Sequence, residues 1–123
     1  VLKTLNSLGV RIFLITNGLS KVQRGRLAIS GIADYFDNVF ISDEIGHNKP
    51  SKEYFDYISE RITDFNKTNT LIVGDSLVSD IALGVNNGVD SCHFNPHGIS
   101  AKNRIKPTYE IEKMSELIEI INS

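Results

Sequence analysis

Two aspartates near the end of an apolar run are candidates for metal chemistry. The run Leu71–Val73 leads directly into Gly74 and Asp75, and Asp80 follows five residues later. A short unbroken apolar run is typical of a strand buried in a parallel sheet, and ligands bind just outside the carboxyl ends of such strands. Mg²⁺ prefers carboxylate oxygens and keeps several waters, so Asp75 and Asp80 form a candidate Mg²⁺ site. The simpler interpretation is that Asp75 or Ser79 caps the next helix.

Two further segments carry hydrogen-bond donors and a cation. Thr16, Asn17 and Gly18 follow the apolar run 12–15 and offer one hydroxyl and two backbone amides. Lys49, before Pro50, offers a point charge. Each segment also has an ordinary interpretation, as a strand end in a turn or as a solvated loop lysine.

Alternating strands and helices must position these residues. Apolar runs predict strands over 12–15, 39–41, 71–73 and 91–94, separated by segments with helical spacing. This alternation predicts an α/β fold in which a Rossmann-like parallel sheet has helices on both faces. Right-handed crossovers place all the strand carboxyl ends at one edge. We therefore expect Thr16, Lys49 and Asp75 to face one cleft, at separations of roughly 5–10 Å.

The helices are predicted from apolar spacing and from the residues that begin and end them. They cover residues 1–8, Ser20 to Ser30, a segment from Ser51, a segment from Asp80 to Gly88, and the C-terminal residues around 114–121. The segment after Asp80 is expected to bury Ile81 and Val85. The stretch around Pro96, Gly98 and Pro107 is predicted to be irregular.

The order and spacing of the polar segments resemble the second, third and fourth motifs of the haloacid dehalogenase superfamily of hydrolases. The matching segments are Ile15-Thr16-Asn17-Gly18, Lys49-Pro50, and Gly74-Asp75 with Asp80. These proteins are mostly Mg²⁺-dependent phosphatases. The resemblance implies that Thr16 and Lys49 are catalytic and bind phosphate together with Asn17 and Gly18. It also implies that Asp75 binds Mg²⁺, with Asp80 as a ligand or a supporting partner.

Finer features are similar to one branch of the superfamily, the nucleotidases that clear non-standard pyrimidine nucleoside monophosphates. These features are Gln23, Arg26-Leu27, Ser30-Gly31, Tyr35-Phe36-Asp37, Ile45-Gly46 and the segment 90–95. His93 departs from this branch, where Trp or another aromatic residue is common. The implied reaction is phosphoryl transfer from a small phosphate ester, a nucleoside 5′-monophosphate, to a carboxylate, followed by hydrolysis of the aspartyl-phosphate.

The first motif of the superfamily, a strand ending in Asp-x-Asp, is missing from this sequence. In the superfamily it supplies the nucleophile and the general acid/base, and a cap domain is inserted soon after it. We therefore expect residues 1–123 to be the C-terminal portion of a core domain, without the cap domain, the first strand and the nucleophile. The strands at 12–15 and 71–73 would flank the missing strand. Apolar strand edges invite pairing, so the gap is either filled by an N-terminal segment or another chain, or closed by direct pairing of the two strands, and we expect filling.

Composition narrows the function classes. The formal charge is −2 with both signs mixed along the chain, and no basic stripe indicates a nucleic-acid polymer as partner. No apolar run reaches membrane-spanning length, so no membrane partner is expected. The single cysteine, Cys92, excludes a disulfide framework and favours a reducing cytoplasm.

Several alternatives stay open. A dehalogenase of the same superfamily is one, although the paired aspartates favour a phosphatase. A non-catalytic module that binds phosphate or a partner on the same fold is another. Asp43 and Glu44 either touch the rim of the site or lie in a solvated loop. His47, His93 and His97 have no metal-like spacing or acidic partners and are expected to be loop or partly buried histidines.

Overall fold

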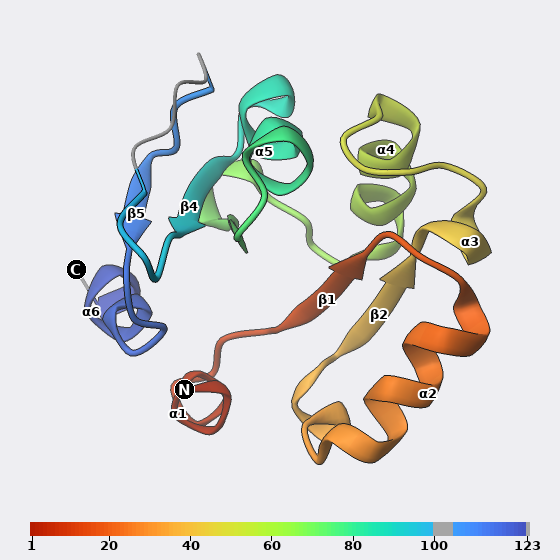
Figure 1. Ribbon diagram of the computed structural model, residues 1–123, viewed down its shortest axis with the longest axis horizontal. Coiled ribbons are helices and arrows are strands. Elements are labelled where there is room, and N and C mark those ends of the chain that lie inside the picture. The colour runs from red at the N-terminus through yellow and green to blue at the C-terminus, as the bar shows by residue number, and fades with distance from the viewer. Residues whose placement is uncertain (100–104, 123) are drawn as a thin grey trace. The chain divides into compact units, whose positions relative to one another are not determined.

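The strands form two parallel sheets, one in each of two compact units. The computed structural model describes residues 1–99 and 105–122, and the units comprise residues 1–48 and 49–123. The first unit contains the sheet β1-β2, and the second contains the sheet β3-β4-β5. Every strand pairing is parallel among the residues described. The predicted parallel α/β architecture is therefore confirmed (Figure 1).

The first unit places two strand ends side by side. Its elements in chain order are α1 (Leu2–Ser7), β1 (Phe13–Thr16), α2 (Ser20–Ser30), η1 (Ala33–Tyr35), β2 (Asn38–Ile41) and α3 (Ser42–Ile45). The register pairs Thr16, the last residue of β1, with Ile41, the last residue of β2. The segments that follow both strands therefore lie at one end of this sheet (Figure 1). The predicted helix 20–30 is confirmed, and it ends where Gly31 adopts a left-handed φ of 76°.

The second unit carries the remaining strands. Its elements in chain order are α4 (Lys52–Arg61), η2 (Lys67–Asn69), β3 (Leu71–Gly74), η3 (Leu77–Ile81), α5 (Ala82–Asn87), β4 (Asp90–Phe94), β5 (Tyr109–Ile111) and α6 (Glu116–Asn122). The Ser51 side chain caps α4 by accepting a 3.2 Å hydrogen bond from the Tyr54 amide. η3 is a π-helical turn that leads into α5.

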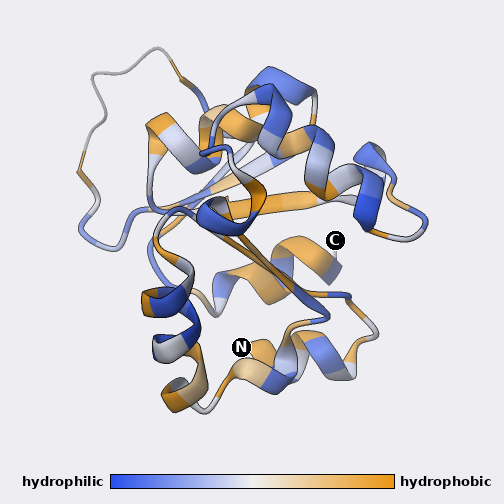
Figure 2. Cartoon of the chain, turned by 90° about the vertical axis from the view of Figure 1, so that its right-hand side faces the viewer, coloured by the Kyte–Doolittle hydropathy of each residue, from blue (hydrophilic) through white to orange (hydrophobic). Residues whose placement is uncertain are grey.

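Helices cover both faces of the β3-β4-β5 sheet. Successive side chains of a strand point to opposite faces, so each face offers apolar side chains to a helix. Leu117 of α6 lies in a core cluster with Cys92 and Ile111, and Leu71, Val73, Phe94 and Ile120 pack against it. α6 is coloured mostly hydrophobic in Figure 2. On the opposite face, α5 approaches closely at Gly84. A Cβ there would lie 3.6 Å from Ile72 and 3.3 Å from the Ser91 side chain. The odd-numbered and even-numbered apolar residues of β3 thus face different helices.

Two predictions about this unit were wrong or incomplete. Val85 is 49% exposed, while Ala82, Leu83 and Gly84 are buried. The reason is that α5 packs against the sheet at Gly84, so the next residue, Val85, lies about 100° around the helix from that contact. The stretch predicted as irregular is followed by a short strand, β5, and residues 100–104 of that stretch lie outside the described residues.

No helix in the described ranges has the length and apolar character needed to cross a membrane.

Candidate active site

The segment after β1 is folded by hydrogen bonds from inside its own unit. The Thr16 hydroxyl donates to the Asn17 carbonyl oxygen at 3.2 Å, and Gln23 Nε2 donates to the same oxygen at 3.3 Å. The Gly18 amide donates to Ser42 Oγ at 2.9 Å. A phosphate would therefore take the Gly18 amide only by displacing Ser42. Gly18 has a φ of 145°, and a Cβ there would collide with Gln23, so glycine is required at this position.

The first turn after β2 is bonded to α2 through the side chains of Asp43 and Glu44. Ser42 starts α3, and Asp43 Oδ2 accepts a 2.8 Å hydrogen bond from the Ser20 amide. Glu44 accepts from the Ser20 hydroxyl at 2.5 Å and from two nitrogens of Arg24 at 2.7 Å each. The hydrogen bond from Arg24, then that from Ser20, lowers the pKa of Glu44 to about 2. Asp43 and Glu44 therefore lie on a short helix bonded to α2 and not in a loosely solvated loop.

Lys49 and Asp80 form a buried ion pair in the second unit. Lys49 Nζ lies 2.5 Å from Asp80 Oδ1, and the two side chains are 7% and 11% exposed. Asp80 Oδ2 also accepts a 3.4 Å hydrogen bond from the Ser76 amide. The simple interpretation of Lys49 as a solvated loop residue is thus wrong. A lysine ammonium this buried needs a compensating anion, and Asp80 provides it.

Gly74 and η3 place Asp80 under the end of β3. A Cβ at position 74 would overlap the Asp80 carboxylate, so only glycine leaves room for it. The Ser76 hydroxyl caps η3 by accepting a 3.2 Å hydrogen bond from the Ser79 amide. Ser76, and not Asp75 or Ser79, therefore caps the turn that follows β3. The side chain of Asp75 lies at the exposed surface.

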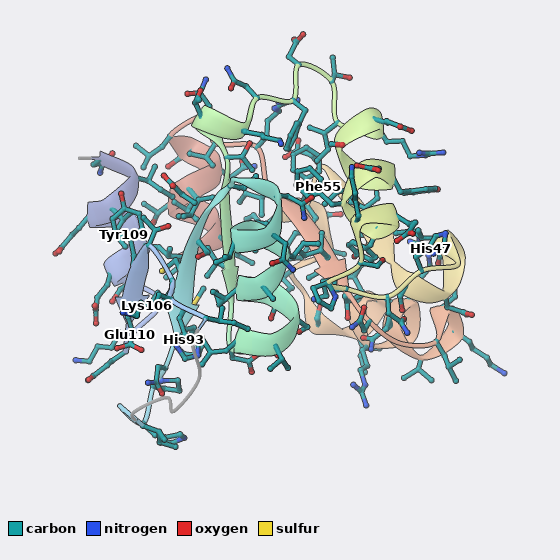
Figure 3. The ribbon with its side chains drawn as sticks, turned by 90° about the horizontal axis from the view of Figure 1, so that it is seen from above. His47, Phe55, His93, Lys106, Tyr109 and Glu110 are labelled. Carbon is teal, nitrogen blue, oxygen red and sulfur yellow. The ribbon has the colours of Figure 1, made fainter. Side chains whose placement is uncertain are left out.

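His93 supports the backbone that carries Asp75. The ring is buried, and its Nε2 lies 3.2 Å from the Asp75 carbonyl oxygen. A carbonyl oxygen only accepts, so Nε2–H is the donor. On the other side, Nδ1 lies 3.2 Å from Glu110 Oε1, and Figure 3 shows the two side chains next to each other. His93 thus connects the end of β3 to β5, a role that the sequence pattern did not reveal.

The structure groups the predicted site residues into two sets. Thr16, Asn17 and Gly18 lie together at the end of β1, and Lys49, Asp75 and Asp80 belong to the second unit. The expected proximity of Thr16 to Lys49 and Asp75 joins residues of the two units and stays a prediction. Ser42 and His93 were missed as supports, because their roles depend on residues 24 and 18 positions away in the sequence.

A metal at Asp75 would have few protein ligands. Among residues 1–99 and 105–122, no group of three or more His, Cys, Asp or Glu side chains is arranged to hold a metal ion. Mg²⁺ is commonly bound by one or two carboxylates, with waters and substrate phosphates as its remaining ligands. The exposed Asp75 carboxylate fits the role of one such protein ligand. Asp80, five residues later and held by Lys49, is the second carboxylate near the end of β3.

Comparison with known proteins defines the class of this protein. A family model for haloacid dehalogenase-like hydrolases matches residues 1–88, and the chain belongs to that family. It is 45% identical over 111 residues to the HAD-hydrolase YfnB of Bacillus subtilis. Over the same number of residues it is 38% identical to the pyrimidine 5′-nucleotidase PynA of Streptococcus pneumoniae and 39% identical to the pyrimidine 5′-nucleotidase YjjG of Escherichia coli.

Solved structures agree with the fold. The crystal structure of YfnB bound to magnesium matches with a TM-score of 0.93 and 42% identity, over 99% of this chain and 54% of that one. The three relatives above each align with 90% of this chain, which covers 47–49% of their length. The chain thus spans about half the length of the curated relatives it matches. The predicted membership in the haloacid dehalogenase superfamily is confirmed.

Proposed function

We propose that the complete protein is a Mg²⁺-dependent phosphatase that hydrolyses nucleoside 5′-monophosphates. The buried Lys49–Asp80 pair beside the exposed Asp75 is the observation that carries this proposal. It holds an ammonium group and two carboxylates around the end of one strand, as phosphoryl transfer with a metal requires. The nucleotidase names of PynA and YjjG support the choice of substrate, and the magnesium-bound structure of YfnB supports the choice of metal.

The residues of this chain would bind and neutralise the phosphate. The Thr16 hydroxyl and the Asn17 amide donate to its oxygens, with the Gly18 amide joining them if Ser42 yields. Lys49 offsets the negative charge of the phosphate and of the attacking carboxylate, while Asp80 keeps its ammonium group in place. Asp75 would hold Mg²⁺, with Asp80 as the supporting carboxylate. When bound, the metal would supply charge neutralisation for the transferring group.

The covalent steps require a carboxylate from outside residues 1–123. In the proposed reaction this carboxylate attacks phosphorus, the ester P–O bond breaks, and the departing alkoxide takes a proton from a general acid. Water then cleaves the aspartyl-phosphate to give inorganic phosphate and the free carboxylate. We therefore expect the 123-residue chain alone to be inactive.

The test is steady-state hydrolysis of uridine 5′-monophosphate by the complete protein with and without Mg²⁺. Asp75→Asn should lower kcat by about 10²–10³-fold, because one preorganised charge is lost from the transition state. Lys52→Ala serves as the control, since Lys52 is 77% exposed in its pair with Asp56. Robust turnover by the isolated 123-residue chain, or no effect of Asp75→Asn, would refute the proposal. Release of halide from a 2-haloacid without phosphatase activity would identify a dehalogenase instead.

A further inference from the structure

A shallow cavity, widely open to solvent, lies in the first unit beside the proposed phosphate-binding residues. Its volume is about 590 Å³, within the range of about 300–1,000 Å³ that is usual for small-ligand sites. All of its lining residues belong to residues 17–48. They are Asn17, Gly18, Leu19, Ser42, Asp43, Gly46 and Asn48. They come from the segments that follow β1 and β2, which end at the same edge of their sheet (Figure 1).

The cavity lies where the organic group of a bound phosphate ester would extend. Asn17 and Gly18 line it and also belong to the segment proposed to bind phosphate. A phosphate ester held by Thr16 and Asn17 must extend its organic group into neighbouring space. Because this cavity shares Asn17 and Gly18 with that segment, it lies where the group beyond the ester bond can be received.

The lining selects for hydrogen-bond donors. Asp43 Oδ2 is occupied by the Ser20 amide, which fixes the carboxylate, and in the described part of the chain no donor engages its Oδ1. An ionised carboxylate only accepts hydrogen bonds, so Oδ1 suits a hydroxyl or N–H group. The lining includes Asn48 and Leu19, whose side chain is 64% exposed, but no lysine or arginine. A second anionic group would therefore meet the negative charge of Asp43 without a compensating cation.

We propose that this cavity binds an uncharged, donor-bearing leaving group such as a nucleoside, and that Asp43 rejects substrates with a second phosphate. This inference rests on the proposed phosphatase function. It assigns the substrate specificity of that function to Asp43 on α3. Asp43 is thus a specificity residue, and the catalytic groups are elsewhere.

The neighbouring Glu44 provides a matched control. Asp43 and Glu44 lie on the same short helix, and Asn or Gln at either position removes one negative charge while keeping an oxygen acceptor. Only Asp43 lines the cavity, whereas Glu44 is bonded to Arg24 and Ser20. A general change in charge would affect both variants equally, while a contact with the leaving group would affect Asp43→Asn alone.

The experiment measures kcat/KM of the complete protein for uridine 5′-monophosphate, ribulose 1,5-bisphosphate and p-nitrophenyl phosphate. We expect Asp43→Asn to reduce the preference for the monophosphate over the bisphosphate about tenfold or more. Glu44→Gln should leave this preference within about twofold. Asn48→Asp, which adds a second carboxylate to the cavity, should increase the preference and tests the idea even if Asp43→Asn does not fold.

The outcomes separate this inference from the proposed function. An equal change in Asp43→Asn and Glu44→Gln, or an unchanged preference in both Asp43→Asn and Asn48→Asp, would overturn the assignment of the cavity. In that case the wild type would still hydrolyse p-nitrophenyl phosphate. If the wild type with Mg²⁺ hydrolyses none of the three esters, the phosphatase function fails, and the assignment of the cavity fails with it.

Discussion

Replacing Lys49 by alanine should reduce stability far more than replacing an exposed lysine. The Lys49 and Asp80 side chains are 7% and 11% exposed, so their pair belongs to the buried class. Removing one partner of a buried pair leaves an uncompensated charge and costs about 3–5 kcal/mol. Exposed pairs contribute about 0–1 kcal/mol. We therefore expect Lys49→Ala to lower the free energy of unfolding by about 3–5 kcal/mol, a large share of the roughly 5–15 kcal/mol that is usual for a domain.

Urea denaturation of the complete protein, followed by circular dichroism, measures this change as a shift of the midpoint at constant slope. The matched control is Lys52→Ala, which breaks an exposed pair with Asp56 in the same unit and should change stability by less than about 1 kcal/mol. The double variant Lys49→Met with Asp80→Asn removes both charges. Its loss of stability should be smaller than the summed losses of the single variants Lys49→Met and Asp80→Asn. Equal losses in Lys49→Ala and Lys52→Ala, or strict additivity in the double variant, would refute the reasoning.

Three further predictions concern other parts of the chain. Glu44→Gln should lower stability by about 0.5–1 kcal/mol at pH 7. The pKa of Glu44 falls from an ordinary 4.5 to about 2 on folding, so this difference should be complete above pH 4.5 and vanish as the pH falls through 2 in thermal melts. Gly74→Ala should destabilise by about 1–3 kcal/mol because its methyl group displaces the Asp80 carboxylate. Gly25→Ala, whose Cβ meets nothing within 4 Å, should not destabilise when compared by urea denaturation. The amides of β3 that face away from β4 should exchange hydrogen more slowly in the complete protein than in the isolated 123-residue chain, if another strand pairs there. Equal exchange would count against that pairing.

Most strands could be predicted from the sequence because they are apolar runs that end in polar residues. The predicted runs 12–15 and 71–73 differ by at most one residue at either end from β1 and β3. β5 was missed because its three residues, Tyr109–Ile111, include an exposed tyrosine and an exposed glutamate, so no apolar run marks it. Its formation depends on pairing with β4, which local propensity cannot reveal.

The candidate site was predictable in its residue types but not in its contacts. The sequence placed Lys49 and Asp80 near strand ends, yet their ion pair joins positions 31 residues apart and depends on tertiary packing. The hydrogen bond from the Gly18 amide to Ser42 Oγ likewise links the segment after β1 to the first residue of α3. Such contacts follow from how the strands align, so spacing along the chain carries little signal for them.

Because of the π-helical turn η3, the number of residues between β3 and α5 determines where Asp80 lies. A regular α-helix advances about 100° per residue, and the wider turn adds backbone before α5 begins. Deleting one residue from positions 77–79 would turn Asp80 away from Lys49, although neither side chain of the pair had been altered. Deletion scanning should therefore find this segment intolerant, while substitutions at Val78, which is 64% exposed, are accepted. Natural relatives that keep this pair are expected to conserve the length of the turn more strictly than its residues.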